Sequence, residues 1–134
     1  MAKIIDIEGI GPKYSEKLSA AGVKTTEALL KQAAHKKGRQ ELAAKTGLDA
    51  SHLLEWVNRA DLMRIKGVGT QYSDLLEAAG VDTVPELAQR NAKNLFAKLE
   101  EVNAEKKLVR QLPTAKQVEA WVKAAKALKR VVEY

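Results

Sequence analysis

The sequence lacks cysteine altogether and contains only three prolines and few aromatic residues, which make up 4% of the chain. The absence of cysteine excludes disulfides, thiolate metal ligands and thiol nucleophiles. β-Branched and aromatic residues do not alternate, whereas Ala, Leu, Lys, Glu and Gln dominate and favour helix. We therefore predict an all-α protein that is stabilised by packing.

Long apolar runs are also missing. None approaches the roughly 18 residues needed to cross a bilayer, and the first residues, MAKIIDIEG, lack the basic and apolar regions of a signal peptide. With 46% apolar and 30% charged residues among 134, the composition is that of a globular protein. We expect a cytoplasmic protein with no membrane partner.

Candidate catalytic groups are few. His35 and His52 are the two histidines of the chain, and their spacing, without cysteine, does not form a zinc-binding pattern. No nucleophile has a recognisable base, and neither a Walker loop nor a dinucleotide-binding turn with three glycines occurs. We expect a protein that is not an enzyme and has no cofactor.

Two segments of the chain repeat each other. IEGIGPKYSEKLSAAGV begins at Ile7, and IKGVGTQYSDLLEAAGV begins at Ile65. When residues 5–33 are aligned with 63–91, 12 of the 29 pairs are identical. This similarity indicates an internal duplication.

A second matched pair extends the duplication. Trp56 lies in EWVNRADL and Trp121 in AWVKAAKAL, both in apolar helical patterns that predict a core position. The two repeats are then residues 1–62 and 63–134. No linker rich in glycine, serine or proline separates them, so we expect the repeats to pack as one compact helical unit.

Helical periodicity and capping residues predict the remaining helices. Asp49 precedes one helix start, while Thr83 with Glu86 and Thr114 with Gln117 have the spacing of capping boxes. These helices are expected at residues 26–34, 39–46, 50–64, 84–90, 92–103, 105–111 and 115–130.

Each repeated segment starts with a glycine turn. The first glycine, Gly9, permits a positive φ, and the apolar Ile10 turns inward. The second glycine, Gly11, leaves space beside the backbone, and the small Ser15 lies one helical turn later, where a larger side chain would push the helices apart. The second segment has the same pattern from Gly67 onward.

A helix follows each turn and ends at Gly22 or Gly80, where a helix end favours a left-handed residue. The amides at the start of such a helix have no partners within it and lie at the positive end of its dipole. The glycine turn is therefore a candidate anion site.

At these residues the sequence resembles the helix-hairpin-helix superfamily, whose hairpin has the form Gly-apolar-Gly followed by a small residue four positions on. The resemblance covers residues 5–23 and 63–81, and the whole chain is similar to an uncharacterised family of tandem helix-hairpin-helix domain proteins. It implies DNA binding through loop amides without reading of sequence. It also implies that loop carbonyls sometimes hold a monovalent cation.

The resemblance and the charge pattern together give the candidate nucleic-acid-binding residues. They are Gly9, Gly11, Lys13, Lys17, Lys66, Gly67, Gly69, Lys116, Lys123, Lys126 and Arg130. Lys66 occupies the position that Glu8 has in the first hairpin. Gln71 and Leu75 replace the two lysines of the first hairpin helix, so we expect the second hairpin to bind phosphate less tightly.

The positive charge is concentrated near the C-terminal end. The chain has a net charge of +6, and residues 106–130 contain eight basic residues against Glu119 alone. In the helix predicted there, apolar residues line one side and basic residues the other. The apolar side comprises Val118, Trp121, Ala125, Leu128 and Val132, and the basic side comprises Lys116, Lys123, Lys126 and Arg130. Such a face either binds an anionic partner such as nucleic acid or is simply solvated.

Two other functions are consistent with the sequence. Residues 40–56 resemble a helix-turn-helix with residues 49–58 as the reading helix. The residues that would then face a major groove are Ser51, His52, Glu55, Asn58 and Arg59. Alternatively, the hairpins form a scaffold for a protein partner or for self-association, which the acidic residues near them favour.

The tyrosines that recur at matching positions, Tyr14 and Tyr72, are expected to pack against the hairpins. Stacking on bases is the other role open to them.

Overall fold

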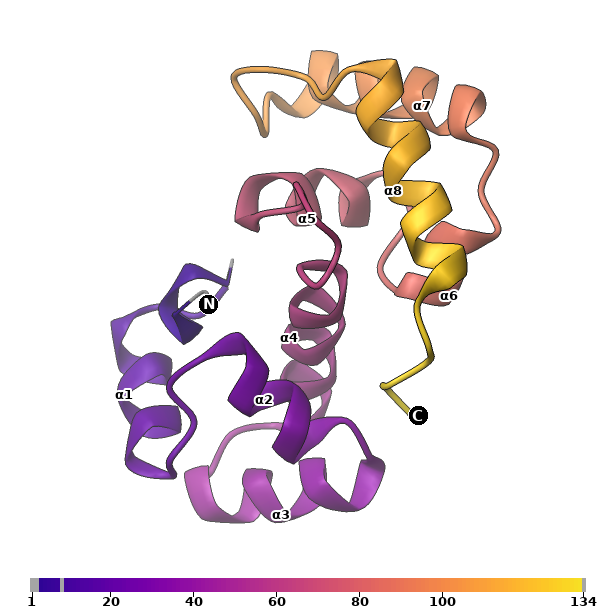
Figure 1. Cartoon of the computed structure of the whole chain (residues 1–134). Coiled ribbons are helices and arrows are strands. Elements are labelled where there is room, and N and C mark those ends of the chain that lie inside the picture. Colours follow the sequence, from indigo (N-terminus) through magenta and orange to yellow (C-terminus); the bar gives the residue numbers. More distant parts are fainter. Residues whose placement is uncertain (1–2, 8, 134) are drawn as a thin grey trace. The chain divides into compact units, whose positions relative to one another are not determined.

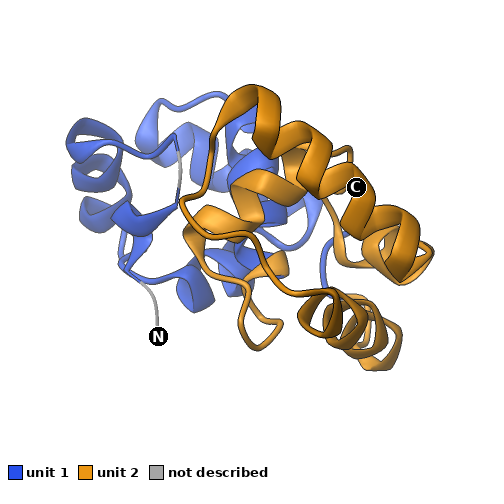
Figure 2. Cartoon of the chain, turned by 90° about the horizontal axis from the view of Figure 1, so that it is seen from above, with its two compact units in different colours: residues 1–61, 131–134 blue, residues 62–130 orange. Residues whose placement is uncertain are grey.

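The computed structural model describes residues 3–7 and 9–133, and the chain divides into two compact units (Figure 2). Unit 1 comprises residues 1–61 and 131–134, and unit 2 comprises residues 62–130. All the regular elements among the described residues are helices, and Lys3 and Thr25 form an isolated bridge. The prediction of an all-α fold is confirmed.

Unit 1 contains five helical elements (Figure 1). They are η1 (Ile4–Asp6), α1 (Pro12–Ala20), α2 (Thr26–Ala33), α3 (Lys36–Thr46) and α4 (Ala50–Leu62), the last of which ends on the first residue of unit 2. α1 starts with proline, whose missing N–H costs little there. The hydroxyl of Thr25 accepts a bond from Ala28 N and caps α2, and α3 ends at Gly47 with φ of 74°. The carboxylate of Asp49 accepts a bond from Ser51 N, as expected for the cap of α4.

Unit 2 contains four helices (Figure 1). They are α5 (Thr70–Ala78), α6 (Val84–Ala88), α7 (Ala92–Lys106) and α8 (Ala115–Ala127). Thr114 and Gln117 form the predicted capping box at α8. Thr83 caps α6 through Glu86 N, while the Glu86 carboxylate accepts a bond from Arg90.

The helix predicted at residues 105–111 is wrong. α7 continues to Lys106 and ends at Lys107, which has a left-handed φ of 51°. The side chain of Asn103 then hydrogen-bonds both backbone groups of Val109, at 3.0 Å to the amide and 3.1 Å to the carbonyl. These bonds hold residues 107–114, which we call the α7–α8 connector, in an irregular path.

The predicted end of the last helix is also wrong. α8 ends at Ala127, and Leu128 is extended with ψ of 139°. Arg130 therefore does not extend the basic side of the helix. Val132 is buried, but in unit 1, although residues 131–134 were expected to belong to the second repeat.

A continuous apolar core fills unit 2. α8 packs against α6 and α7, and α5 packs against α7. Leu75, Leu87, Leu99, Val118 and Trp121 are among its fully buried side chains. This core fixes the hairpin helix α5 relative to α8 and to the connector.

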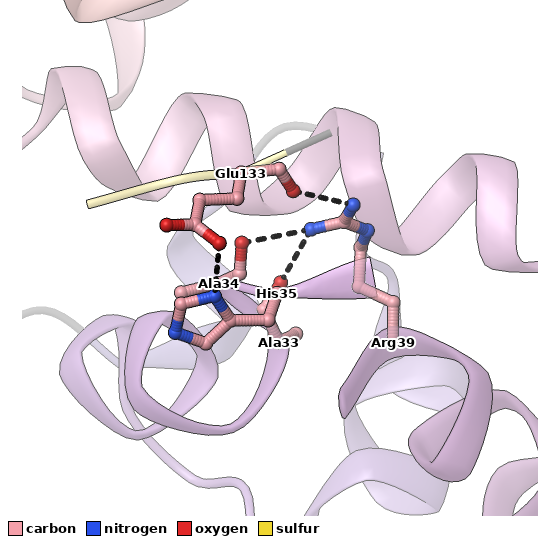
Figure 3. A network of polar contacts seen from close by, with 5 residues as sticks. All are labelled: Ala33, Ala34, His35, Arg39 and Glu133. Carbon is pink, nitrogen blue, oxygen red and sulfur yellow. Dashed lines mark hydrogen bonds and ion pairs between the residues drawn. The ribbon is translucent and has the colours of Figure 1, made fainter. Parts of the chain in front are cut away.

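The C-terminal segment is bound to unit 1 by a polar network (Figure 3). The amide of Glu133 donates to the carbonyl of Ala34 at 2.7 Å, and the Glu133 carboxylate lies 2.8 Å from Nδ1 of His35. The buried guanidinium of Arg39 donates to the carbonyls of Ala33, Ala34 and Glu133. Arg39 thus joins the α2–α3 junction to the C-terminal segment.

Candidate nucleic-acid interface

The two glycine turns have the same backbone geometry. Gly9 has φ of 92° and Gly67 has φ of 90°, as expected for the first glycine of each turn. Each turn is closed by a bond from the amide of the apolar residue after that glycine, Ile10 to the Ile7 carbonyl and Val68 to the Ile65 carbonyl. Both apolar residues are 4% exposed, so they point inward as predicted.

A tryptophan lies against the first glycine of each turn. A Cβ built on Gly9 would stand 3.4 Å from Nε1 of Trp56, and one built on Gly67 would stand 3.2 Å from Nε1 of Trp121. Both indoles are buried, as predicted. The glycines therefore satisfy two requirements at once, a positive φ and room for an indole.

A tyrosine packs on each of these indoles. The rings of Tyr14 and Trp56 have centroids 5.4 Å apart, and those of Tyr72 and Trp121 are 5.3 Å apart. Both tyrosines are partly buried, so the prediction that they pack against the hairpins is confirmed.

The second glycine of each turn is open to solvent. Gly11 and Gly69 are exposed N-cap residues of α1 and α5, and a Cβ built on either would meet nothing within 4 Å. Neither cap residue has a side chain to bond the first amides of its helix. A ligand can therefore approach the first amides of each helix directly, except that Pro12, the first residue of α1, has no N–H.

The second hairpin borders a hollow of about 510 Å³ in unit 2. One wall is the hairpin, and the other is the α7–α8 connector. The lining residues are Gly67, Gly69, Thr70, Gln71, Tyr72, Arg110 and Gln111. Among these residues Arg110 carries the positive charge, and its side chain is exposed.

The candidate lysines of the hairpins lie at the surface. Lys13 and Lys17 are exposed on α1, and Lys66 is exposed beside Gly67. Leu75, which occupies the position of Lys17 in the second repeat, is fully buried in the core of unit 2. Glu8 lies outside the described residues.

The lysines of α8 do not join the second hairpin. Trp121 faces Gly67, and at about 100° per residue Lys116, Lys123 and Lys126 project from the helix about 140–160° away from that tryptophan. All three are exposed. A phosphate at the hairpin and a phosphate at these lysines would be bound on different sides of α8.

Two of the five residues that the helix-turn-helix hypothesis places toward a major groove are buried, whereas Ser51, His52 and Glu55 are exposed. Asn58 and Arg59, which a reading helix would expose, are 8% and 7% exposed. The Ser51 hydroxyl donates to the carboxylate of Asp49, the residue before α4, at 2.8 Å. This side chain therefore takes part in capping the helix. The middle of α4 is therefore part of the scaffold.

Residues for a metal ion are not gathered in the described part of the chain, where no group of three or more His, Asp or Glu side chains has suitable positions. The carbonyls of Ile7 and Ile65 each accept one amide bond in the glycine turns. Each has a second lone pair that could contact the monovalent cation implied by the resemblance.

No helix in residues 3–7 and 9–133 is long and apolar enough to span a membrane.

Arg110 is not among the site residues that the sequence predicts. It belongs to the basic segment, but a helix was expected there, and a helix gives no reason to place Arg110 beside residues some 40 positions earlier. The available signal was Pro113, which disfavours helix just before it.

These features define a small all-helical protein in which each unit has a glycine turn packed on a buried tryptophan. The chain belongs to the family described as a domain of unknown function, DUF4332, whose match covers residues 8–128. No curated protein and no solved structure matches the chain significantly.

Proposed function

We propose that this chain binds DNA through backbone phosphates, without sequence preference and without catalysis, and that its two turns are helix-hairpin-helix motifs. The proposal rests mainly on the helix starts at Gly11 and Gly69, which are exposed and have no side-chain cap. Each follows a glycine turn, and the first glycines of the two turns have nearly equal φ. Lys13 and Lys66 supply positive charge next to these amides. Amides and cations of this kind bind phosphate but do not distinguish bases.

The proposal is tested by fluorescence anisotropy with several unrelated duplexes at 50 and 200 mM salt. Since each neutralised phosphate releases counterions, log affinity should fall with log salt by about 0.9 per contact, so two hairpins give a slope of roughly −2 or steeper. Equal affinities for unrelated duplexes are expected. Absence of binding at 50 mM salt would instead favour the scaffold for a protein partner or self-association.

A matched pair of variants locates the contact. Lys13→Glu should weaken binding to every duplex alike, because it replaces a cation beside the phosphate site with a carboxylate that repels phosphate. Lys123→Glu changes the charge equally but lies on the side of α8 away from the second hairpin, so its effect should be smaller. If Lys123→Glu weakens binding more than Lys13→Glu does, the basic helix and not the hairpin is the main DNA surface.

A further inference from the structure

We infer that Arg110 is the phosphate-binding side chain of the second hairpin, and that the hollow between this hairpin and the α7–α8 connector is a phosphate site. The inference rests on the proposed function and adds a residue from outside both repeated segments. It also gives the second hairpin a cation that comparison of the two repeats does not predict.

The hollow presents polar groups from two segments that are far apart in the sequence. Gly67, Gly69 and Gln71 come from the hairpin, whereas Arg110 and Gln111 come from the connector. Its volume of about 510 Å³ is ample for a phosphate group with its neighbouring sugar. A guanidinium is planar and presents paired N–H donors that match two phosphate oxygens.

The backbone around Arg110 is held on both sides. Val109 is bonded through its amide and its carbonyl to the side chain of Asn103. The carbonyl of Gln111 accepts a bond of 3.0 Å from the hydroxyl of Tyr72, which itself lines the hollow. Because these bonds fix the connector against α5, binding a ligand does not have to order it.

The two units therefore obtain their positive charge differently. In unit 1 the charges are Lys13 and Lys17, on the hairpin helix itself. In unit 2 the corresponding positions are neutral, and Leu75 is used for the core. Besides Lys66 before the turn, the second hairpin therefore obtains a cation from the connector, Arg110.

The ligand chemistry is that of a phosphate oxyanion, either in a nucleic-acid backbone or as free phosphate. Two probes distinguish these sources, a DNA duplex and inorganic pyrophosphate. The experiment uses the full chain with Arg110→Gln and with Lys106→Gln, which removes the same charge from an exposed position at the end of α7 that does not line the hollow.

In the unchanged chain, pyrophosphate should shift the Gly67 and Gly69 amide signals in a ¹⁵N-resolved NMR titration. Arg110→Gln should abolish these shifts, Lys106→Gln should retain them, and Arg110→Lys should restore them in part. On duplex DNA, Arg110→Gln should weaken binding about tenfold and reduce the salt slope by about 0.9, with a smaller loss for Lys106→Gln.

Equal behaviour of Arg110→Gln and Lys106→Gln with both probes would overturn the inference, even if the chain binds DNA. Shifts that depend on Arg110 with pyrophosphate, in a chain that does not bind DNA, would retain the site for free phosphate and contradict the proposed function. Absence of any shift with pyrophosphate in the unchanged chain, with DNA binding insensitive to Arg110, would also overturn the inference.

Discussion

The hydroxyl of Tyr72 donates a hydrogen bond of 3.0 Å to the backbone carbonyl of Gln111. The bond joins the hairpin helix α5 to the α7–α8 connector, next to Arg110. The ring of Tyr72 also packs on Trp121, whose indole lies against Gly67. One side chain thus links the glycine turn, the core of unit 2 and the proposed phosphate-binding arginine.

Tyr72→Phe tests this link. The substitution retains the ring and removes the bond to Gln111, so the free energy of unfolding should fall by about 1 kcal/mol in a urea titration. Phosphate binding at the second hairpin should weaken as well, because Arg110 loses a support. Gln111→Ala is the control for stability: the bond uses the backbone carbonyl, so this variant should lose less free energy of unfolding. Equal losses in the two variants would contradict a role for the hydroxyl.

The two glycines of the second turn should differ in their tolerance of a methyl group. Gly67→Ala forces a positive φ on alanine and crowds the indole of Trp121 at 3.2 Å, so it should lower the free energy of unfolding by about 1–3 kcal/mol. Gly69→Ala meets open space at an ordinary φ of −97° and should cost clearly less. Thermal unfolding of both variants measures the difference, and equal destabilisation would argue against the packing described for Trp121.

Arg39 should contribute strongly to the stability of unit 1. Arg39→Met leaves the buried carbonyls of Ala33 and Ala34 without these donors and removes the bond to the Glu133 carbonyl, so we expect a loss of roughly 2–4 kcal/mol in a denaturant titration. Lys37→Met removes the same charge from an exposed position on α3 and should change stability little. A small loss for Arg39→Met would mean that the C-terminal segment binds unit 1 without it.

The cap at Asp49 predicts a pH dependence. Hydrogen bonds from the amide and hydroxyl of Ser51 lower the pKa of Asp49 below its ordinary value of 3.8. Because the folded pKa is lowered, the carboxylate stabilises the folded chain fully above pH 3.8 and loses this contribution as pH falls through the folded pKa.

Asp49→Asn isolates this contribution, since asparagine caps helices without titrating. The stability of the unchanged chain relative to this variant should decrease on acidification below pH 3.8. A difference between the two proteins that stays constant between pH 6 and 2 would contradict the assignment.

The local features of the fold were predictable because they depend on near neighbours. The positive φ of Gly9 and Gly67, the inward Ile10 and Val68, and the caps at Asp49 and Thr114 each follow from a few adjacent residues. These local preferences do not depend on how the helices pack in the folded chain. The prevalence of helix-favouring residues, without alternating β-branched and aromatic ones, argued against a β-sheet.

The features that the sequence did not predict depend on contacts between distant segments. A lysine at position 107 gives no strong sign of a left-handed helix end, and the bonds of Asn103 to Val109 and of Tyr72 to Gln111 form only in the folded chain. For the same reason the position of Arg110 in the hollow could not be read from the repeat. The early end of α8 could not be predicted either, because residues 131–134 belong to unit 1 and not to the second repeat.

The most direct test of the account is an amide chemical-shift map of the full chain on addition of a short DNA duplex at 50 mM salt. DNA binding through the hairpins predicts that the largest shifts lie at Gly9–Lys13 and Gly67–Gln71, with a further group at Arg110, and that all of them diminish at 200 mM salt. Shifts confined to other surfaces, or no shifts at either salt concentration, would contradict it.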